Sequence, residues 1–318
     1  MPHFKIANGL QTVEGRYLSN VSLYYQTWGD PNGEVVWICH ALTGDTSVES
    51  WWPTLFKSNG GWLDPAVHFL VCANSLGSCY GSSFEYEGEQ LQLHHRDAVY
   101  AFDQLRSHLG ITKLKWLIGG SMGGQQALEW SLFRPALIQN LVLIGTNAKQ
   151  SAWGKAWNHV QRQAINSAGD GAGLALARQI AMISYRTFED FQEKENHTLN
   201  EKGDTLSYLN YQGEKFLERF DQQAYLQLIG MMDVHDISYA RGASVASILQ
   251  TIKVDTIVIE LAGDVLFPEE EQRVLYQHIP SASHYKIDTS KGHDGFLLEG
   301  KTISRIIEAA EQKNLILR

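Results

Sequence analysis

LKWLIGGSMGGQQALEW, residues 114–130, is the stretch that decides the fold class of this 318-residue chain. Four of its first five residues are apolar and this segment has the length of a strand, and residues 125–133 have a helical pattern that ends before Pro135. The turn between them, residues 119–123, reads G-x-S-x-G and carries small residues where the backbone must reverse sharply. Such a turn presents the Ser121 hydroxyl beside the free N–H groups of a helix N-terminus. The alternative is a structural turn in which Ser121 only caps the helix.

Short apolar, β-branched segments alternate with helical patterns along most of the chain, which is typical of a parallel sheet covered on both faces. The expected strands are residues 35–39, 69–72, 114–118, 141–144, 256–259 and 284–287, with helices at 95–109 and 301–312. Residues 147–248 contain amphipathic helical patterns and no convincing strand. The sequence therefore predicts an α/β core domain of residues 1–146 and 249–318, interrupted by a helical cap of residues 147–248.

A serine hydroxyl becomes a good nucleophile only when a base takes its proton and a carboxylate orients that base. In enzymes built on this strand–turn–helix unit, the partners follow the serine in the order Asp or Glu, then His. Asp264 follows one expected strand, and His293 follows the last strand in the segment KGHDG. We therefore expect Ser121, Asp264 and His293 to form a catalytic triad. The alternatives are a turn-forming role for Asp264 and an ordinary loop position for His293.

The loop after the first core strand, CHALTG at residues 39–44, is the expected source of a second oxyanion-binding N–H group. The candidate donors are the backbone amides of Leu42 and Met122. The neighbouring imidazole of His40 is expected to have a structural role.

Composition narrows the function classes. The formal net charge of −9 argues against nucleic acid as a partner but leaves small anionic ligands possible. The three cysteines, Cys39, Cys72 and Cys79, follow neither a disulfide nor a zinc pattern, so we expect no metal and a reducing compartment. The N-terminus does not resemble a signal peptide, and no apolar run has the length of a membrane span. We therefore expect a cytoplasmic protein that acts without a membrane.

Several sequence blocks together resemble the homoserine O-acyltransferases of the α/β-hydrolase superfamily. The blocks in the core are CHALTG (39–44), NSLGSCYGS (74–82), GGSMGGQQALEW (119–130), LFP (266–268) and GHD (292–294). The expected cap adds matching blocks at 177–178, 185–186, 211–213, 219–221 and 232–233. They occur in the order typical of the family, from near residue 20 to near residue 300.

This resemblance implies an α/β-hydrolase fold and a ping-pong acyl transfer through an acyl-Ser121 intermediate. The acetyl group would come from acetyl-CoA, as co-substrate without a permanently bound cofactor, and pass to the hydroxyl of L-homoserine in methionine biosynthesis. The resemblance also implies a homodimer formed through the cap helices.

The family's substrate-binding positions fall on Arg178 for the amino-acid carboxylate, Tyr185 on the same helix face, and Asp294 for the ammonium group. A guanidinium suits a carboxylate, and a carboxylate suits an ammonium group. The alternatives are a salt bridge within the cap for Arg178 and a turn or helix-cap role for Asp294.

The chain departs from the family pattern in the segment after Ser83, which is shorter than usual, and at Gln125 and Gly295, where Met and Ala are usual. The shorter loop leaves the acyl donor open, with succinyl-CoA as an alternative to acetyl-CoA. L-Serine remains an alternative acceptor. A serine ester hydrolase of the same fold and a binding protein with an inactive site are further alternatives.

Overall fold

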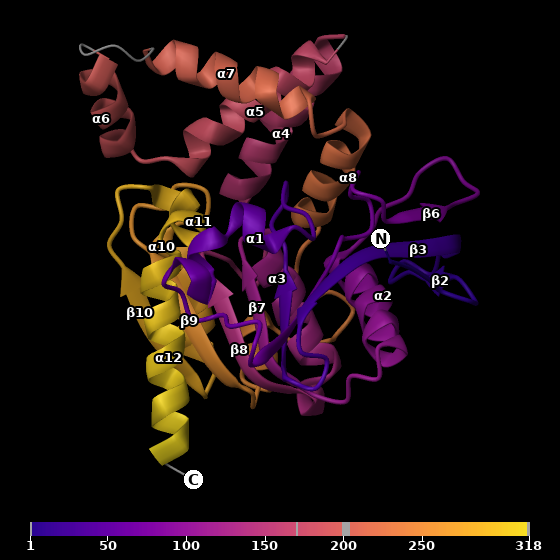
Figure 1. Ribbon diagram of the computed structural model, residues 1–318. Coiled ribbons are helices and arrows are strands. Elements are labelled where there is room, and N and C mark those ends of the chain that lie inside the picture. Colours follow the sequence, from indigo (N-terminus) through magenta and orange to yellow (C-terminus); the bar gives the residue numbers. More distant parts are fainter. Residues whose placement is uncertain (1, 170, 199–203, 317–318) are drawn as a thin grey trace.

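A ten-stranded sheet forms the centre of the molecule, with eight strands in the order β1-β3-β5-β4-β7-β8-β9-β10 and two more, β2 and β6, paired with β3 (Figure 1). The computed structural model describes residues 2–169, 171–198 and 204–316. Six strands run parallel: β4 (Glu34–Cys39), β5 (His68–Ala73), β7 (Leu114–Gly120), β8 (Ile138–Ile144), β9 (Asp255–Leu261) and β10 (Ala282–Ile287). They include every strand expected from the sequence.

The sheet continues into an antiparallel part that the sequence analysis did not predict. The long strand β3 (Tyr17–Gly29) pairs antiparallel with β5 and also with three short strands. These are β1 (His3–Lys5), β2 (Leu10–Gln11) and β6 (Ser83–Glu85). Much of β3 is polar and partly exposed, so it lacks the continuous apolar run by which the buried parallel strands were recognised.

Two apolar clusters cover the two faces of the sheet, because side chains of successive strand residues point to opposite faces. Trp37 and Leu117 belong to the cluster that includes residues of α2 (His95–His108) and α3 (Met122–Phe133). Their chain neighbours Ile38 and Trp116 belong to the other cluster, together with Ile303 and Ile307 of α12 (Gly300–Ile316). The parallel sheet is therefore sandwiched between helices.

Five of the six helices described between β8 and β9 lie over one end of the sheet, at the top of Figure 1. They are α4 (Ala152–Ser167), α5 (Ala172–Tyr185), α6 (Phe188–Thr198), α7 (Thr205–Leu217) and α8 (Gln222–Asp233). Parallel β8 ends where this layer begins, so the layer lies on the carboxyl side of the strands, where α/β enzymes place their ligands. No helix in the described ranges has both the length and the apolar character needed to cross a membrane.

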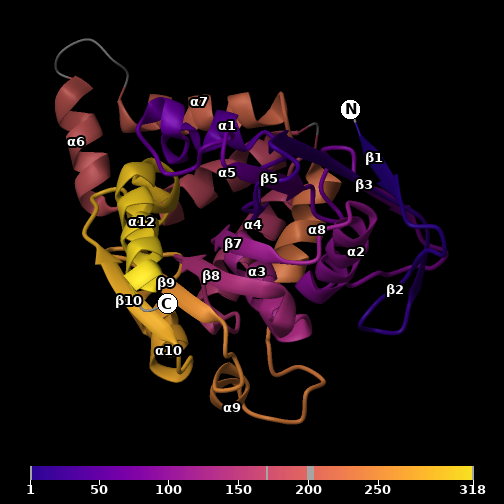
Figure 2. The ribbon, with the colours of Figure 1, turned by 60° about the horizontal axis from the view of Figure 1, so that its bottom comes forward.

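The chain enters and leaves the helical layer through two neighbouring segments. The amide of Gln150 donates to the carbonyl of His235 at 2.8 Å, and Ile237 N–H donates to Ala148 O at 3.1 Å. Beyond them, α9 (Val245–Leu249) packs against α10 (Glu269–His278) of the core (Figure 2). The domain division at residues 147 and 248 remains a prediction, and these contacts favour a cap boundary nearer residue 237.

Candidate active site

The turn between β7 and α3 holds Ser121 in a strained backbone conformation, with φ 57° and ψ −130°. A Cβ atom on Gly119 would lie 2.2 Å from the carbonyl oxygen of Gly123, and one on Gly123 would lie 2.1 Å from that of Cys39. Only glycine therefore fits at these two positions. The Ser121 side chain makes no capping bond to α3, which rules out the helix-cap alternative.

Ser121, Asp264 and His293 are buried together at the ends of three different strands. The imidazole Nε2 of His293 lies 2.8 Å from Ser121 Oγ, and its Nδ1 lies 2.7 Å from Asp264 Oδ2. Because an ionised carboxylate only accepts hydrogen bonds, Nδ1 carries the hydrogen and Nε2 is free to accept the serine proton. The structure thus brings together the three residues that the sequence analysis proposed as a triad.

Asp264 is a turn former as well as the partner of the histidine. Its Oδ1 accepts the backbone N–H groups of Leu266 at 2.9 Å and Phe267 at 2.8 Å, while Oδ2 faces His293. The contacts therefore fit both interpretations of this residue, because one carboxylate oxygen forms the turn and the other faces the histidine. The turn fixes the carboxylate and thereby fixes the imidazole.

Two buried residues, one on the wall of the cavity that Ser121 lines and one directly after Ser121 in the chain, have a backbone N–H without an acceptor among the described residues. They are Leu42 and Met122. Buried backbone donors are nearly always paired, so two free ones at the site of a nucleophile fit the binding of an oxyanion. The His40 imidazole accepts Ser75 N–H at 2.9 Å, and burial lowers its pKa, so it has the structural role expected of it.

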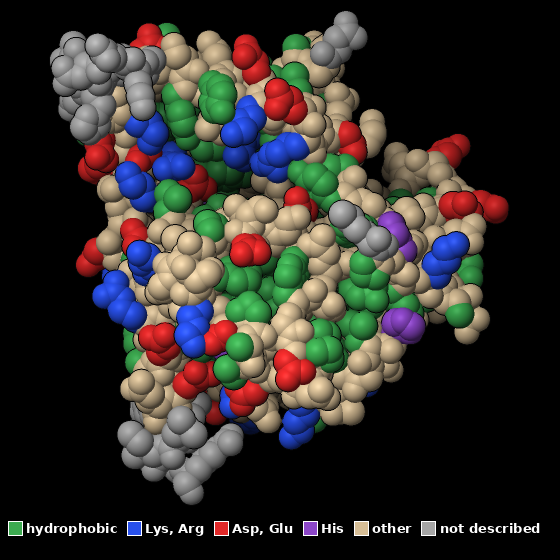
Figure 3. Space-filling view, viewed as in Figure 1, with side chains coloured by type: hydrophobic (Ala, Val, Ile, Leu, Met, Phe, Trp, Pro, Cys, Tyr) green, Lys and Arg blue, Asp and Glu red, His purple; other side chains and the backbone are tan. Residues whose placement is uncertain are grey.

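A cavity of about 300 Å³ opens above Ser121, between the core and the helical layer. Figure 3 shows this side of the molecule hollowed between the two parts, with Lys and Arg side chains at the edges of the hollow. The cavity walls include the apolar side chains of Leu42, Trp51, Phe296 and Leu297, and the polar side chains of Arg178, Tyr185, Arg219 and Asp294. All three predicted substrate-binding residues therefore face the same space as Ser121.

Arg178 has no ion pair with any described residue, so the alternative of a salt bridge within the cap is wrong for this part of the chain. Its guanidinium instead lies over two aromatic rings, 5.6 Å from that of Tyr185 and 5.1 Å from that of Phe216. Burial raises the pKa of Tyr185, whose phenol is therefore neutral near pH 7. A half-buried cation without a counter-ion is suited to a carboxylate on a ligand.

Asp294 lies on the cavity wall and is already paired with a cationic side chain. Its Oδ2 lies 2.8 Å from Nε of Arg186, and it makes no capping bond to the following helix α11 (Gly295–Leu298). Arg186 also lies 3.4 Å from the buried Asp190, which pairs with Lys291 at 2.6 Å. The sequence analysis did not assign a role to Arg186, although it is part of the matching block at 185–186.

Arg219 is a second cavity residue without an assigned role in the sequence analysis. It lies just after α7, in the matching block at 219–221, and its contacts reach two loops of the core. That block was the only available signal, because nothing in the local pattern shows which loops an arginine will reach after folding.

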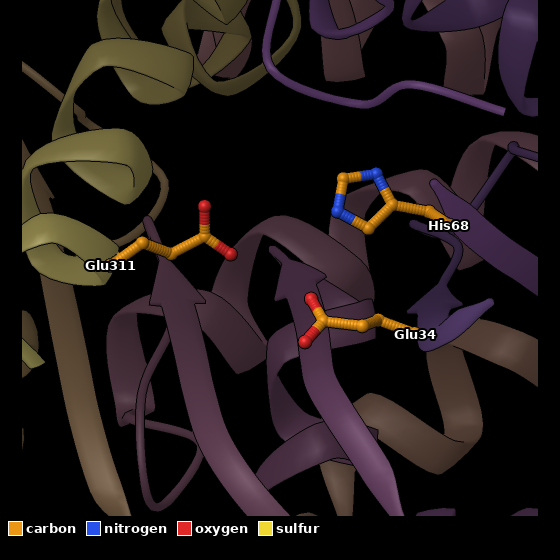
Figure 4. A group of neighbouring side chains, drawn as sticks. All are labelled: Glu34, His68 and Glu311. Atoms are coloured by element: carbon orange, nitrogen blue, oxygen red, sulfur yellow. The ribbon is translucent and has the colours of Figure 1, made fainter. Parts of the chain in front are cut away.

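Glu34, His68 and Glu311 form a group with metal-ligand geometry at the opposite edge of the sheet (Figure 4). The Asp64 N–H donates to His68 Nδ1 at 3.1 Å, so the neutral ring carries its hydrogen on Nε2, the atom that faces the two carboxylates. A hydrogen on this nitrogen repels a cation there and suits hydrogen bonding to a carboxylate. We therefore interpret this group as a histidine whose Nε2–H faces two acidic side chains.

Comparison with known proteins agrees with this geometry. Residues 34–300 match the family model described as the alpha/beta hydrolase fold. The chain is 35% identical to the homoserine O-acetyltransferase of Chlorobaculum tepidum, across 96% of this chain and 93% of that protein. It is 36% identical to the enzyme of the same name from Trichormus variabilis, across 92% of this chain and 89% of that protein. The chain belongs to the homoserine O-acetyltransferase family.

Solved structures extend the comparison from the sequence to the fold. The homoserine O-acetyltransferase of Staphylococcus aureus superimposes with a TM-score of 0.84 at 27% identity, covering 96% of this chain and 94% of its own. An acetyl esterase, MekB, superimposes with a TM-score of 0.85 at 20% identity, covering 98% and 96%. Transferases of the homoserine O-acetyltransferase family and esterases thus share this α/β-hydrolase fold, and the fold alone does not distinguish their reactions.

Proposed function

We propose that this chain transfers an acetyl group from acetyl-CoA to the hydroxyl of L-homoserine through an acetyl-Ser121 intermediate. The observation that carries the proposal is the pair of opposite charges on the cavity wall above Ser121. The Arg178 guanidinium suits the carboxylate of an amino acid, and the Asp294 carboxylate suits its ammonium group. An esterase has no need for such a pair.

In the first half-reaction, Ser121 Oγ attacks the thioester carbonyl while His293 Nε2 takes its proton. The oxyanion of the tetrahedral intermediate is stabilised by the Leu42 and Met122 amides, each worth about 10²–10³ in rate. Collapse breaks the C–S bond, and His293 returns the proton to the departing CoA sulfur. The acetyl group is then an ester on Ser121.

In the second half-reaction, Arg178 and Asp294 hold homoserine so that its hydroxyl lies next to His293. The histidine takes the hydroxyl proton as the oxygen attacks the acetyl ester, and the same two amides stabilise the second oxyanion. Collapse breaks the bond between the acetyl carbon and Ser121 Oγ, and His293 gives the proton back to Ser121. O-Acetylhomoserine leaves, and the free enzyme is restored.

The reaction requires that water does not reach the acetyl-enzyme before homoserine does. CoA release from acetyl-CoA should therefore depend on homoserine. Release at the same rate without homoserine would contradict the transferase proposal and favour a serine ester hydrolase.

The covalent intermediate and the substrates are tested separately. Ser121→Ala should abolish both CoA release and the mass increase of one acetyl group on the protein, which would exclude a binding protein with an inactive site. Competition of acetyl-CoA with succinyl-CoA, and of L-homoserine with L-serine, compares the alternative substrates, and we expect acetyl-CoA and L-homoserine to be preferred.

We also propose that the chain forms a homodimer through the helical layer and acts in the cytoplasm. Most large hydrophobic side chains that are exposed in the described residues lie on its helices: Trp153, Val160, Leu176, Ile183, Phe188, Leu206, Tyr211 and Leu217. Apolar patches of this kind mark association surfaces. The three cysteines are free thiols, as in proteins of a reducing compartment.

A further inference from the structure

We propose that Arg219 is a positioning residue of the oxyanion hole, fixing the core turn that carries the Leu42 amide. This inference rests on the part of the proposed function in which Leu42 and Met122 stabilise the oxyanion. It does not depend on the identity of the acyl acceptor.

Arg219 joins the helical layer to two loops of the core. Its Nη1 donates to the carbonyl of Thr43 at 2.8 Å and to the hydroxyl of Tyr80 at 2.9 Å. Thr43 follows β4 and Tyr80 follows β5, two neighbouring strands of the sheet. The guanidinium is itself held by stacking over Phe216, 5.0 Å from the ring centre, and has no ion pair with a described residue.

The Thr43 carbonyl belongs to the turn that presents the Leu42 amide. Gly44 N–H donates to Ala41 O at 2.9 Å and closes this turn, with Leu42 and Thr43 as its central residues. A short turn changes the direction of its N–H groups when its peptide planes rotate, and a fixed carbonyl at Thr43 resists that rotation. Among the described residues, Arg219 is the only donor to this carbonyl.

The consequence is that the helical layer and the oxyanion hole are linked. Arg219 lies between α7 and α8, so the turn that carries the Leu42 amide gains a second hydrogen bond, beside its own Gly44–Ala41 bond, when this part of the layer is seated on the core. Errors of position in a catalytic group of about 1 Å cost up to about 100-fold in rate. Because Arg219 acts only through this turn, we expect its loss to slow the acylation of Ser121 about tenfold.

The test is the acylation of Ser121 by p-nitrophenyl acetate, an ester that requires neither CoA nor homoserine. Arg219→Gln should slow the burst of p-nitrophenol about tenfold at saturating ester, with little change in the apparent ester affinity. Tyr80→Phe removes the other acceptor and should keep the burst within about twofold of the parent. Lys215→Gln removes a positive charge from α7, four residues before Arg219, and is expected to have no effect on the burst.

A trifluoromethyl ketone supplies a readout that a loss of stability alone would not change. It adds to Ser121 and places its oxyanion between the two amides, so Arg219→Gln should weaken its inhibition by the same factor as the burst. Arg219→Lys should restore part of the loss, because an ammonium group can donate to Thr43 O. Thermal unfolding of each variant shows that it is folded at the assay temperature.

Two results would overturn the positioning role. One is an unchanged ketone affinity in folded Arg219→Gln. The other is a normal burst combined with a raised KM for acetyl-CoA, which would assign the guanidinium to the phosphates of the donor. If the chain proved to be an esterase, the burst with p-nitrophenyl acetate and the inhibition by the ketone would still decide the role of Arg219.

Discussion

Among the described residues, the Ser121 hydroxyl has one hydrogen-bond partner, His293 Nε2, and the other ring nitrogen of His293 faces Asp264. This arrangement equips the site to form an acyl-enzyme but does not select what receives the acyl group. Selection depends on Arg178 and Asp294, whose environments differ. Arg178 has no counter-ion among the described residues, whereas Asp294 shares its charge with Arg186. We therefore expect the carboxylate of the acceptor to contribute more to binding than its ammonium group.

Replacement of Arg178 by Gln is expected to raise KM for homoserine about 10- to 150-fold with a smaller effect on kcat, because it removes a charged hydrogen bond worth about 1.5–3 kcal/mol. Steady-state kinetics with varied homoserine measures the change. With 3-aminopropan-1-ol, which lacks the carboxylate, parent and variant should be equally poor. A variant effect that persists with this analogue would show that Arg178 does not contact the carboxylate.

At the scale of secondary-structure elements, the segment that follows α5 is attached to the loop that carries His293. Thr187 Oγ1 donates to Ser290 O at 2.6 Å, and Lys291 Nζ lies 2.6 Å from the buried carboxylate of Asp190. Lys194 of α6 pairs with the same carboxylate. One buried acidic side chain thus connects the helical layer to the histidine loop.

Asp190→Asn is expected to lower the free energy of unfolding by about 2–3 kcal/mol, because its cationic partners lose the charged acceptor they share. Urea unfolding measures the change. The matched control is Glu193→Gln, which removes a more exposed partner of Lys291 and should cost less than about 1 kcal/mol. Equal effects of the two substitutions would contradict the special role of Asp190.

At the scale of the whole molecule, two buried histidines from distant parts of the chain meet beneath the helical layer. The rings of His95 and His235 lie 5.4 Å apart. Burial lowers the pKa of His95 to about 3 and that of His235 to about 4, from an ordinary value of 6.5. The Gln125 side chain and the charge of Glu129 favour the charged form of His95, but burial disfavours it more strongly.

The stability of the fold should therefore decline in acid. The unfolded chain takes up protons at these histidines below pH 6.5 and the folded chain does not, so the free energy of unfolding is highest above pH 6.5. It should fall toward pH 4 by about 1.4 kcal/mol per pH unit for each histidine. Burial raises the pKa of Glu271, whose contribution has the opposite sign.

His95→Gln should remove about 1.4 kcal/mol per pH unit from the acid slope, while His235 and the buried His40, whose pKa values burial also lowers, still contribute. Urea unfolding at pH 7, 6 and 5 gives the slopes, and Glu271 is common to both proteins. An unchanged slope would mean that His95 is already accessible to protons in the folded state.

The proposed dimer is also a property of the whole molecule. Phe188 and Leu206 are 73% and 68% exposed, which makes them the most exposed large hydrophobic residues of the helical layer among those described. Leu206→Glu should shift the sedimentation coefficient from dimer to monomer at micromolar concentration, because it places a charge on the apolar surface. Val67→Glu changes an exposed residue of the α/β core domain, away from the helical layer. It is the control and should leave the dimer unchanged. A parent protein that sediments as a monomer would contradict the proposal.

Much of the fold and of the reaction centre could be predicted because the information is local. The strand, turn and helix of residues 114–133 are continuous in the chain, and the order of Ser121, Asp264 and His293 follows from the order of parallel strands. The amphipathic helices between β8 and β9 could also be predicted from their residue patterns. The antiparallel β3 was not, because its polar, partly exposed residues carry no clear period.

What only the tertiary structure decided is which distant side chains meet. Arg219 reaches Thr43 across 176 residues, and Arg186 takes up the charge of Asp294 from a different element. No local pattern encodes such pairs, because each partner is a common surface residue whose contact depends on how the helical layer is seated on the core. The chain sequence by itself thus predicted that Ser121, Asp264 and His293 would come together, and the structure brings them together. Folding decided which groups hold the oxyanion turn and which cation remains free for a substrate.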